Sequence, residues 1–214
     1  MVHSCEGGKK SVNVDLYMPE PLLGIGVVTE YQVLAQPDER VQSGVMKTLS
    51  IDVRRAEPQD AAAVAEVHRL SWTQAYAGLI PYKPLTQMIE RRGETWWRKA
   101  TRGPATLLVL DVAGTIAGYA TTGLNRAKAL PYDGEVYEIY LRPEFQGIGL
   151  GRRLFGESRR LLKSLGCEGL VVWCLEDSEH AARFFRRHGG LDMVEGMEDF
   201  GGISLRKIGF VWPR

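Results

Sequence analysis

The sequence has few cysteines, no long apolar run and almost no net charge, and each shortage excludes a class of protein. Its three cysteines are widely spaced and form no CxxC pair, which argues against a disulfide framework and a zinc site. The start, MVHSCEGGKK, lacks a signal-peptide core, and LLGIGVV is too short to span a bilayer. We therefore expect a cytoplasmic protein with no metal and no membrane partner.

The charge balance excludes a further class of protein, one that binds nucleic acid through its overall charge. Lys and Arg number 27 against 26 Asp and Glu, a formal net charge of +1. So small a charge does not draw a protein toward nucleic acid, so any anion must be bound by a local arrangement. With 214 residues, of which 44% are hydrophobic, the chain is long enough to bury one main core.

The chain divides near residue 45. Residues 1–45 mix Gly, Pro and polar residues around one strand-like segment, GIGVVTEYQVL, whereas the pattern is orderly from Ile51 onward. This predicts an N-terminal extension or arm at 1–45, followed by a single domain at 46–214. Two interpretations of the extension stay open: an arm that packs on the domain or on a partner, or upstream sequence before a natural start at Met46.

Hydrophobic periodicity and turn residues predict a mixed order of strands and helices in the domain. Gly93 weakens the second helix, and Ala113-Gly114 suits a hairpin turn. The mixture predicts one α/β sheet with parallel and antiparallel neighbours. The expected strands are 51–56, 105–112, 115–124, 135–143, 169–175, 192–197 and 203–212, and the expected helices are 57–72, 85–101, 150–165 and 177–190.

The segment EFQGIGLGRRLF, residues 144–155, joins a strand to a helix through three glycines. Glycines there expose backbone N–H groups at the positive end of a helix, which suits a phosphate. A Walker loop would need Lys-Ser/Thr after Gly151, and a dinucleotide loop starting at Gly147 would need glycine at 152. Neither is present; the pattern that fits is Gln-x-x-Gly-x-Gly, formed by Gln146, Gly149 and Gly151.

In this setting the pattern resembles the GNAT superfamily of N-acetyltransferases, which use acetyl-CoA. The likeness spans residues 51–212 and includes VRRAEPQDAAAVAEVH, SWTQAYAGLIP (a connection common among bacterial members), EIYLRPEFQGIGLGRRLF and SEHAARFFRRHGG. It implies a GNAT-like α/β fold, with a mixed, splayed central sheet flanked by helices on both faces. It also implies acetyl transfer from acetyl-CoA to a primary amine, without a metal.

The resemblance further implies where the cofactor lies. The pyrophosphate would rest on the backbone amides of residues 147–152, and the pantetheine arm would run beside the strand at 139–141, with an N–H near Leu141 stabilising the oxyanion. The cofactor-binding residues implied are Ile139, Tyr140, Leu141, Gln146, Gly147, Ile148, Gly149, Leu150, Gly151, Arg152, Ser178 and Phe185.

An ammonium must lose a proton before it can attack, so the site needs a base. Glu135 lies eleven residues before Gln146, where the histone-acetylating branch of the family has its general base, and Glu138 is the reserve. In a regular strand these two carboxylates point to opposite faces. The alternative is structural: either one could pair with an arginine such as Arg126 or Arg142.

The sequence departs from the family at the residue that would protonate the leaving group. Many relatives place a tyrosine in the last helix to protonate the departing thiolate, and this chain has Phe185 there. Water, Tyr137 or Tyr140 could serve instead. The departure leaves open a second function, an acyl-CoA-binding sensor or regulatory module with little turnover.

The resemblance places the acceptor pocket at Trp72, Tyr76, Tyr82 and Tyr137, with core packing as the alternative for Trp72. The acceptor could be a small molecule, an amino acid or a protein N-terminus, and the sequence does not choose among them. The N-terminal arm and the final strand offer edges through which two copies could form a homodimer.

Overall fold

The computed structural model describes residues 10–11 and 50–213. The strand-like segment GIGVVTEYQVL, Met46 and almost all of the predicted extension at 1–45 lie outside the described residues. The part of the extension that is described forms a two-residue strand, β1 (Lys10–Ser11).

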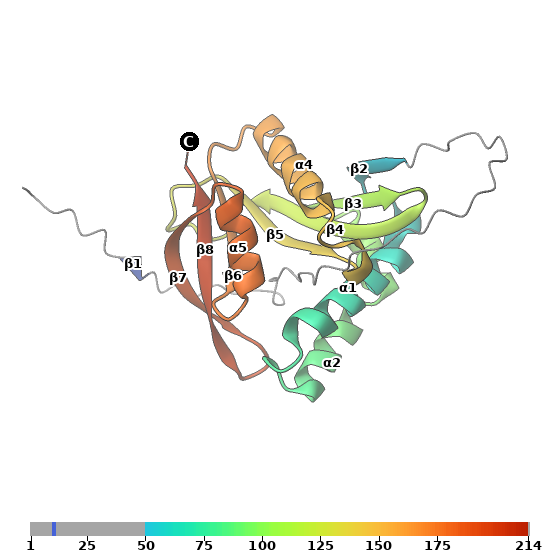
Figure 1. The fold of residues 1–214 in the computed structure, drawn as a ribbon, viewed down its shortest axis with the longest axis horizontal. Helices are drawn as coiled ribbons and strands as arrows, with labels where there is room; N and C mark the ends of the chain where they lie inside the picture. Colours follow the sequence, from blue (N-terminus) through green and yellow to red (C-terminus); the bar gives the residue numbers. More distant parts are fainter. Residues whose placement is uncertain (1–9, 12–49, 214) are drawn as a thin grey trace, which may run out of the picture.

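One mixed sheet runs through the molecule (Figure 1). It has eight strands in the order β1-β7-β8-β6-β5-β4-β3-β2. Two neighbouring pairs, β1 with β7 and β5 with β6, are parallel, and the other neighbours are antiparallel. The strands after β1 are β2 (Ile51–Arg55), β3 (Thr106–Val112), β4 (Thr115–Leu124), β5 (Gly134–Leu141), β6 (Leu170–Leu175), β7 (Leu191–Asp199) and β8 (Ser204–Trp212).

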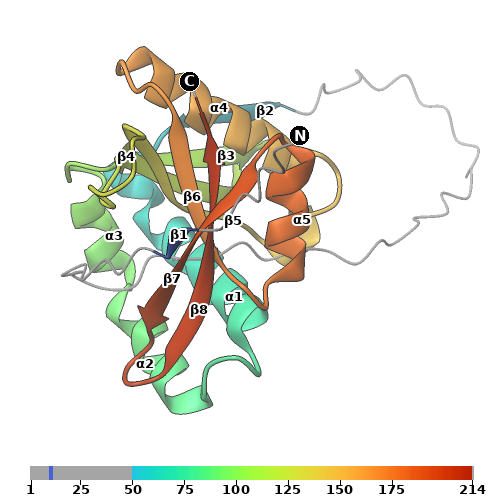
Figure 2. The same cartoon turned by 90° about the vertical axis from the view of Figure 1, so that its left-hand side faces the viewer.

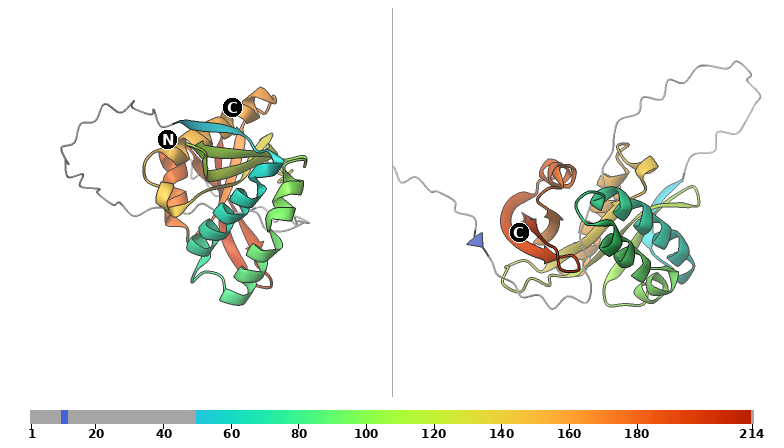
Figure 3. Two further views of the ribbon diagram at one scale, coloured as in Figure 1. Left: turned by 90° about the vertical axis from the view of Figure 1, so that its right-hand side faces the viewer. Right: turned by 90° about the horizontal axis from the view of Figure 1, so that it is seen from below.

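Helices cover both faces of this sheet, as Figures 2 and 3 show from two sides. One face packs against α1 (Ala61–Tyr76), α2 (Tyr82–Arg91) and α3 (Glu94–Ala100), and the other against α4 (Leu150–Ser164) and α5 (Glu179–Arg187). A hydrophobic core lies on each face of the sheet, and successive side chains of β3 point into the two cores in turn. Leu108 and Leu110 face α4, whereas Leu107 and Val109 face α1. None of the helices within residues 50–213 is long and apolar enough to cross a membrane.

The single helix expected at 85–101 is two helices in the structure. Helix α2 ends at Arg91 with Arg92 as its C-cap, and Gly93 adopts an extended conformation (φ −71°, ψ −178°) at the N-cap of α3. Glycine is a poor helix former, and Glu94 directly after it suits the positive end of a new helix. The expectation of one continuous helix was therefore wrong, and the break places the Arg92 side chain in the protein interior.

The feature that positions the site is the short contact between β5 and β6. They pair only from Gly134 to Val136 on β5, opposite Leu170 to Val172 on β6, although β5 continues to Leu141 and β6 to Leu175. The sheet therefore splays in its middle. This confirms the splayed sheet that the sequence resemblance implied.

Candidate active site

The end of β5 offers a strand edge to which β6 no longer pairs. The N–H of Arg142 donates to the carbonyl of Ala117 on β4 at 2.8 Å. Successive N–H groups of a strand point to opposite sides, so those of Leu141 and Ile139 point away from β4, into the splay. Pairing with β6 stops at Val136, so an extended ligand could bond to these groups as a strand would.

The glycine loop follows this edge directly. After a 3-10 turn at Pro143–Phe145, Gly147 and Gly149 take left-handed conformations with φ of 76° and 88°, and α4 begins at Leu150. A side chain at Gly149 would meet no atom within 4 Å, so the outer side of the loop is open. Gly151 differs, because its added Cβ would lie 3.4 Å from the Phe184 ring. Two of the three glycines thus shape the loop, and the third makes room for α5.

A basic hollow of about 830 Å³ continues from this loop between α4 and α5. Arginines dominate its lining, which suits a ligand with several phosphates. His188 at its edge stacks on Phe184, with ring centroids 4.3 Å apart. The lining residues are Gly149, Arg152, Arg153, Phe155, Gly156, Arg159, Arg160, Arg187 and His188.

Strand β5 carries a bulge that decides which side chains share a face. Its register with β4 shifts so that Thr121 pairs with Glu138 and Thr122 with Val136, which leaves Tyr137 as the extra residue. Beyond the bulge the faces are exchanged, and Glu135 and Glu138 lie on the same face, the one toward α1. The expectation that they point to opposite faces was wrong, because it assumed a regular strand.

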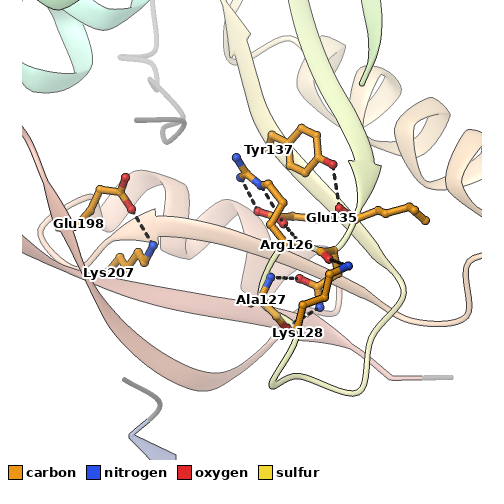
Figure 4. Close-up of polar contacts among 9 residues, drawn as sticks. Arg126, Ala127, Lys128, Glu135, Tyr137, Glu198 and Lys207 are labelled. Atoms are coloured by element: carbon orange, nitrogen blue, oxygen red, sulfur yellow. Dashed lines mark hydrogen bonds and ion pairs between the residues drawn. The ribbon is translucent and has the colours of Figure 1, made fainter. Parts of the chain in front are cut away.

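Glu135 is buried and held by Arg126 (Figure 4). The backbone N–H of Arg126 donates to Oε2 at 2.9 Å, and its guanidinium donates to Oε2 at 3.2 Å and to Oε1 at 2.6 Å. The same guanidinium lies over the Tyr137 ring, 4.0 Å from its centroid. The pairing of a strand carboxylate with Arg126 is the structural alternative that the sequence left open.

Glu138 lies in a buried network on the same face. Its Oε1 accepts from Arg92 at 2.8 Å, and its Oε2 accepts from the Tyr119 hydroxyl at 2.9 Å. Tyr119 is in turn 2.9 Å from Nδ1 of His68, and burial, with Arg92 nearby, holds the pKa of His68 well below its usual range. Sequence reasoning missed Arg92, since it lies 46 residues from Glu138 and reaches it only through the helix break.

The residues expected to form the acceptor pocket are only partly brought together. Trp72 and Tyr76 are buried on α1, and the Tyr76 hydroxyl is 3.1 Å from that of Tyr140. Burial raises the pKa of Tyr140 well above its usual range. Tyr137 is half-buried and donates to the carbonyl of Leu124 at 2.7 Å, whereas Tyr82 is 84% exposed at the start of α2. Trp72 and Tyr76 thus lie next to β5, and Tyr82 does not point into the core.

Comparison with known proteins decides the family. A model of the Acetyltransferase (GNAT) family matches residues 64–190, more than half of the chain. This protein belongs to the GNAT family. It is therefore an acyltransferase, and the resemblance seen in the sequence is confirmed.

Curated GNAT relatives agree. The uncharacterized N-acetyltransferase YuaI of Bacillus subtilis (strain 168) is 29% identical over 164 residues, covering 76% of this chain and 93% of YuaI. A spermidine N(1)-acetyltransferase of Thermoplasma acidophilum is 26% identical over 143 residues, covering 66% of this chain and 88% of that protein. The crystal structure of the PaiA N-acetyltransferase of T. acidophilum with coenzyme A superimposes with a TM-score of 0.59 at 19% identity, covering 77% of this chain and 99% of PaiA. This last likeness shows the GNAT fold.

The last helix departs from the tyrosine common in GNAT members. Phe185 is fully buried, with its ring 5.7 Å from Phe155 and 5.5 Å from Phe210, centroid to centroid. Phe184, which is half-buried, is the aromatic residue beside the glycine loop. Ser178, also half-buried, precedes α5. Phe185 therefore has a packing role here, and its predicted contact with the cofactor stays a prediction.

A second buried ion pair lies across the splay, on the β7–β8 hairpin (Figure 4). Nζ of Lys207 is 2.6 Å from Oε2 of Glu198, and it also lies 4.8 Å from the centroid of the Trp173 ring on β6. Sequence analysis missed this pair, because nothing in a strand pattern tells which opposite charges will be buried together. On the same strand as Trp173, burial raises the pKa of the Cys174 thiol to about 12, which leaves it protonated and unsuited as a nucleophile.

The buried pair of Arg92 and Glu138 predicts a large stability effect. Arg92→Met should lower the free energy of unfolding by about 3–5 kcal/mol, because it leaves the Glu138 carboxylate buried without its cation. Denaturant titration measures this loss. The double variant Arg92→Met/Glu138→Leu should recover most of it, since no buried charge remains.

Arg98→Met provides a matched control, because Arg98 pairs with Glu94 on an exposed helix face. It should cost about 0.3–0.5 kcal/mol. An Arg92→Met loss as small as that of Arg98→Met would show that the buried pair contributes little.

Proposed function

We propose that this GNAT protein transfers the acetyl group of acetyl-CoA to a primary amine by direct attack, with no acyl-enzyme intermediate. The observation that carries the proposal is the continuity of two features: the strand edge at Ile139 and Leu141, and the open glycine loop at Gly147 and Gly149. The first suits an amide-containing arm, and the second suits the diphosphate to which that arm is joined.

The cofactor residues have separate tasks in this proposal. Backbone N–H groups of residues 147–152 hold the diphosphate at the start of α4, and Arg152 and Arg187 supply charge from the hollow. Ile139 and Leu141 bond the arm through their backbone. The N–H of Leu141 stabilises negative charge as it develops on the thioester oxygen.

The chemistry balances without a cofactor beyond the acetyl donor. The amine nitrogen bonds to the thioester carbon and the carbon–sulfur bond breaks, giving an amide and a thiolate. Glu135 is the proposed base for the ammonium proton and Glu138 the reserve; after attack the nitrogen loses a second proton, which passes through water to the thiolate, since Phe185 has none to give. Tyr137 and Tyr76 line the acceptor side, and the acceptor is a small amine, an amino acid or a protein N-terminus.

A rival proposal, a sensor that binds acyl-CoA with little turnover, has one observation in its favour. Both candidate bases are already ion-paired, Glu135 with Arg126 and Glu138 with Arg92. Each carboxylate already accepts hydrogen bonds on both of its oxygens, which leaves less room for an ammonium group to approach. Homodimer formation and a cytoplasmic location stay predictions under either proposal.

An amine panel separates the two proposals. Acetyl-CoA at about 100 times its dissociation constant should stabilise the protein by about 2.7 kcal/mol, seen as a higher melting temperature. Free CoA thiol should then appear when polyamines, amino acids or N-terminal peptides are added, as a thiol reagent detects. Stabilisation without thiol release on every amine supports the sensor, and stabilisation by NADH but not by acetyl-CoA contradicts both proposals.

Gly149→Val tests the glycine loop. Valine there places a branched side chain on the open side of the loop and should abolish stabilisation by acetyl-CoA. Gly114→Val is the matched control, because Gly114 has nearly the same φ, 87° against 88°, and equally open surroundings in the β3–β4 hairpin. Each should cost about 1–2 kcal/mol of strain, but only the loop variant should lose the ligand. Equal retention of acetyl-CoA by both would exclude the loop as the phosphate site.

Glu135→Gln tests the base. It should lower kcat about 100-fold and shift the pH dependence of turnover upward, while stabilisation by acetyl-CoA is unchanged. Glu138→Gln is assayed beside it, because the bulge puts both residues on one face. Normal turnover of Glu135→Gln at neutral pH, with a loss in Glu138→Gln, would transfer the role to Glu138.

A further inference from the structure

We propose that Ser71 is a positioning residue that sets the register of the acetyl-CoA arm along β5, an inference that rests on the proposed function. Ser71 is fully buried on α1, and its hydroxyl donates to the backbone carbonyl of Leu141 at 2.9 Å. Nothing in the glycine pattern points to this residue, which lies 70 positions before Leu141 in the chain.

The Leu141 carbonyl carries a second hydrogen bond. Nε2 of Gln146, the first residue of the glycine pattern, donates to the same oxygen at 2.9 Å. A carbonyl oxygen has two lone pairs, so Ser71 and Gln146 together use both. Gln146 also lies 3.4 Å from Oε1 of Gln74, one turn along α1 from Ser71. Helix α1 therefore holds the end of β5 and the start of the loop together.

The direction of the Leu141 carbonyl shows how the hydrogen bonds from Ser71 and Gln146 affect a ligand bound at this edge. The N–H and C=O of one strand residue point to the same side, so the Leu141 carbonyl points, like its N–H, away from β4 and into the splay. It is the last acceptor on the edge that β6 leaves. Because Ser71 and Gln146 occupy it, a ligand on this edge finds the N–H of Leu141 as its last bonding group.

A stop of this kind fixes register. The pantetheine arm contains amides, and an amide chain can slide along a strand edge unless one pairing is forbidden. With the Leu141 carbonyl taken, the arm cannot advance to donate there, which leaves the N–H of Leu141 for the thioester oxygen. Without the Ser71 hydroxyl, one lone pair becomes available, and a shifted, unproductive register competes.

Ser71→Ala in the full chain tests this. We expect kcat for acetyl transfer to fall about tenfold, the size of one hydrogen bond's effect, whereas affinity for adenosine 3′,5′-bisphosphate, which carries phosphates but no arm, stays within about twofold of wild type. Calorimetry measures the affinity, and thiol release measures kcat. Ser71→Thr, which keeps a hydroxyl, should restore most of kcat.

Ser158→Ala is the matched control. Ser158 is also fully buried in a helix, and its hydroxyl donates to a carbonyl, that of Leu154, at 2.9 Å. It should lose similar stability with no change in kcat. If Ser71→Ala melts below the assay temperature, Ser71→Cys, which keeps the volume and is a weak donor, takes its place with the same expected loss of kcat.

The outcomes distinguish the role of Ser71 from the proposed function on which it rests. Wild-type kcat in Ser71→Ala overturns the proposal, and so does an equal loss of affinity for adenosine 3′,5′-bisphosphate, because Ser71 would then act on the loop or the fold. Failure of the wild-type protein to bind acetyl-CoA would instead remove the proposed function itself. That result is read before any variant is made.

Discussion

The site depends on the parting of two parallel strands inside the protein. A buried backbone N–H or C=O without a partner costs about 1–3 kcal/mol, so a sheet does not normally open in its middle. Here β5 and β6 share only three residue pairs before they separate. The fold meets part of this cost with side chains, through the two donors on the Leu141 carbonyl. Where pairing with β6 has stopped, the N–H groups of Ile139 and Leu141 face the opening, and a ligand can bond to them there.

The charges around this opening follow one rule, that each buried carboxylate carries its own cation. Glu135 has Arg126, Glu138 has Arg92 and Glu198 has Lys207. Such pairs fix side-chain positions more than they add stability, because desolvation offsets much of the attraction. The region between α4 and α5 is different, since its hollow is lined by arginines. An almost neutral protein thus concentrates positive charge where the phosphates of a cofactor would lie.

The sequence predicts most of this fold because the elements near the loop have strong local signals. Gly149 of the glycine pattern and the hairpin residues Ala113 and Gly114 have left-handed backbone conformations in the structure, and so has Gly166, directly after the expected helix at 150–165. Long-range pairings had no such signal. The contacts of Arg92 with Glu138 and of Ser71 with Leu141 depend on how α1 and the α2–α3 break sit against β5, which periodicity does not encode. The bulge at Tyr137 was not predicted either, because one extra residue in a strand leaves the composition and the approximate length of the strand segment unchanged.

That bulge has a consequence for how acceptor chemistry can diverge on this scaffold. Tyr137 is the extra residue of the bulge, so it interrupts the alternation of side chains between the two faces of β5. The alternation restarts after it, and this decides which side chains lie on the acceptor side. Deleting the bulged residue would leave Glu135 and Glu138 two positions apart in a regular strand, still on one face, whereas straightening the strand with every residue kept would turn one of them to the opposite face. Which carboxylates share the face toward α1 therefore depends on how β5 pairs with β4, and a change in that pairing alters the set without substituting either glutamate.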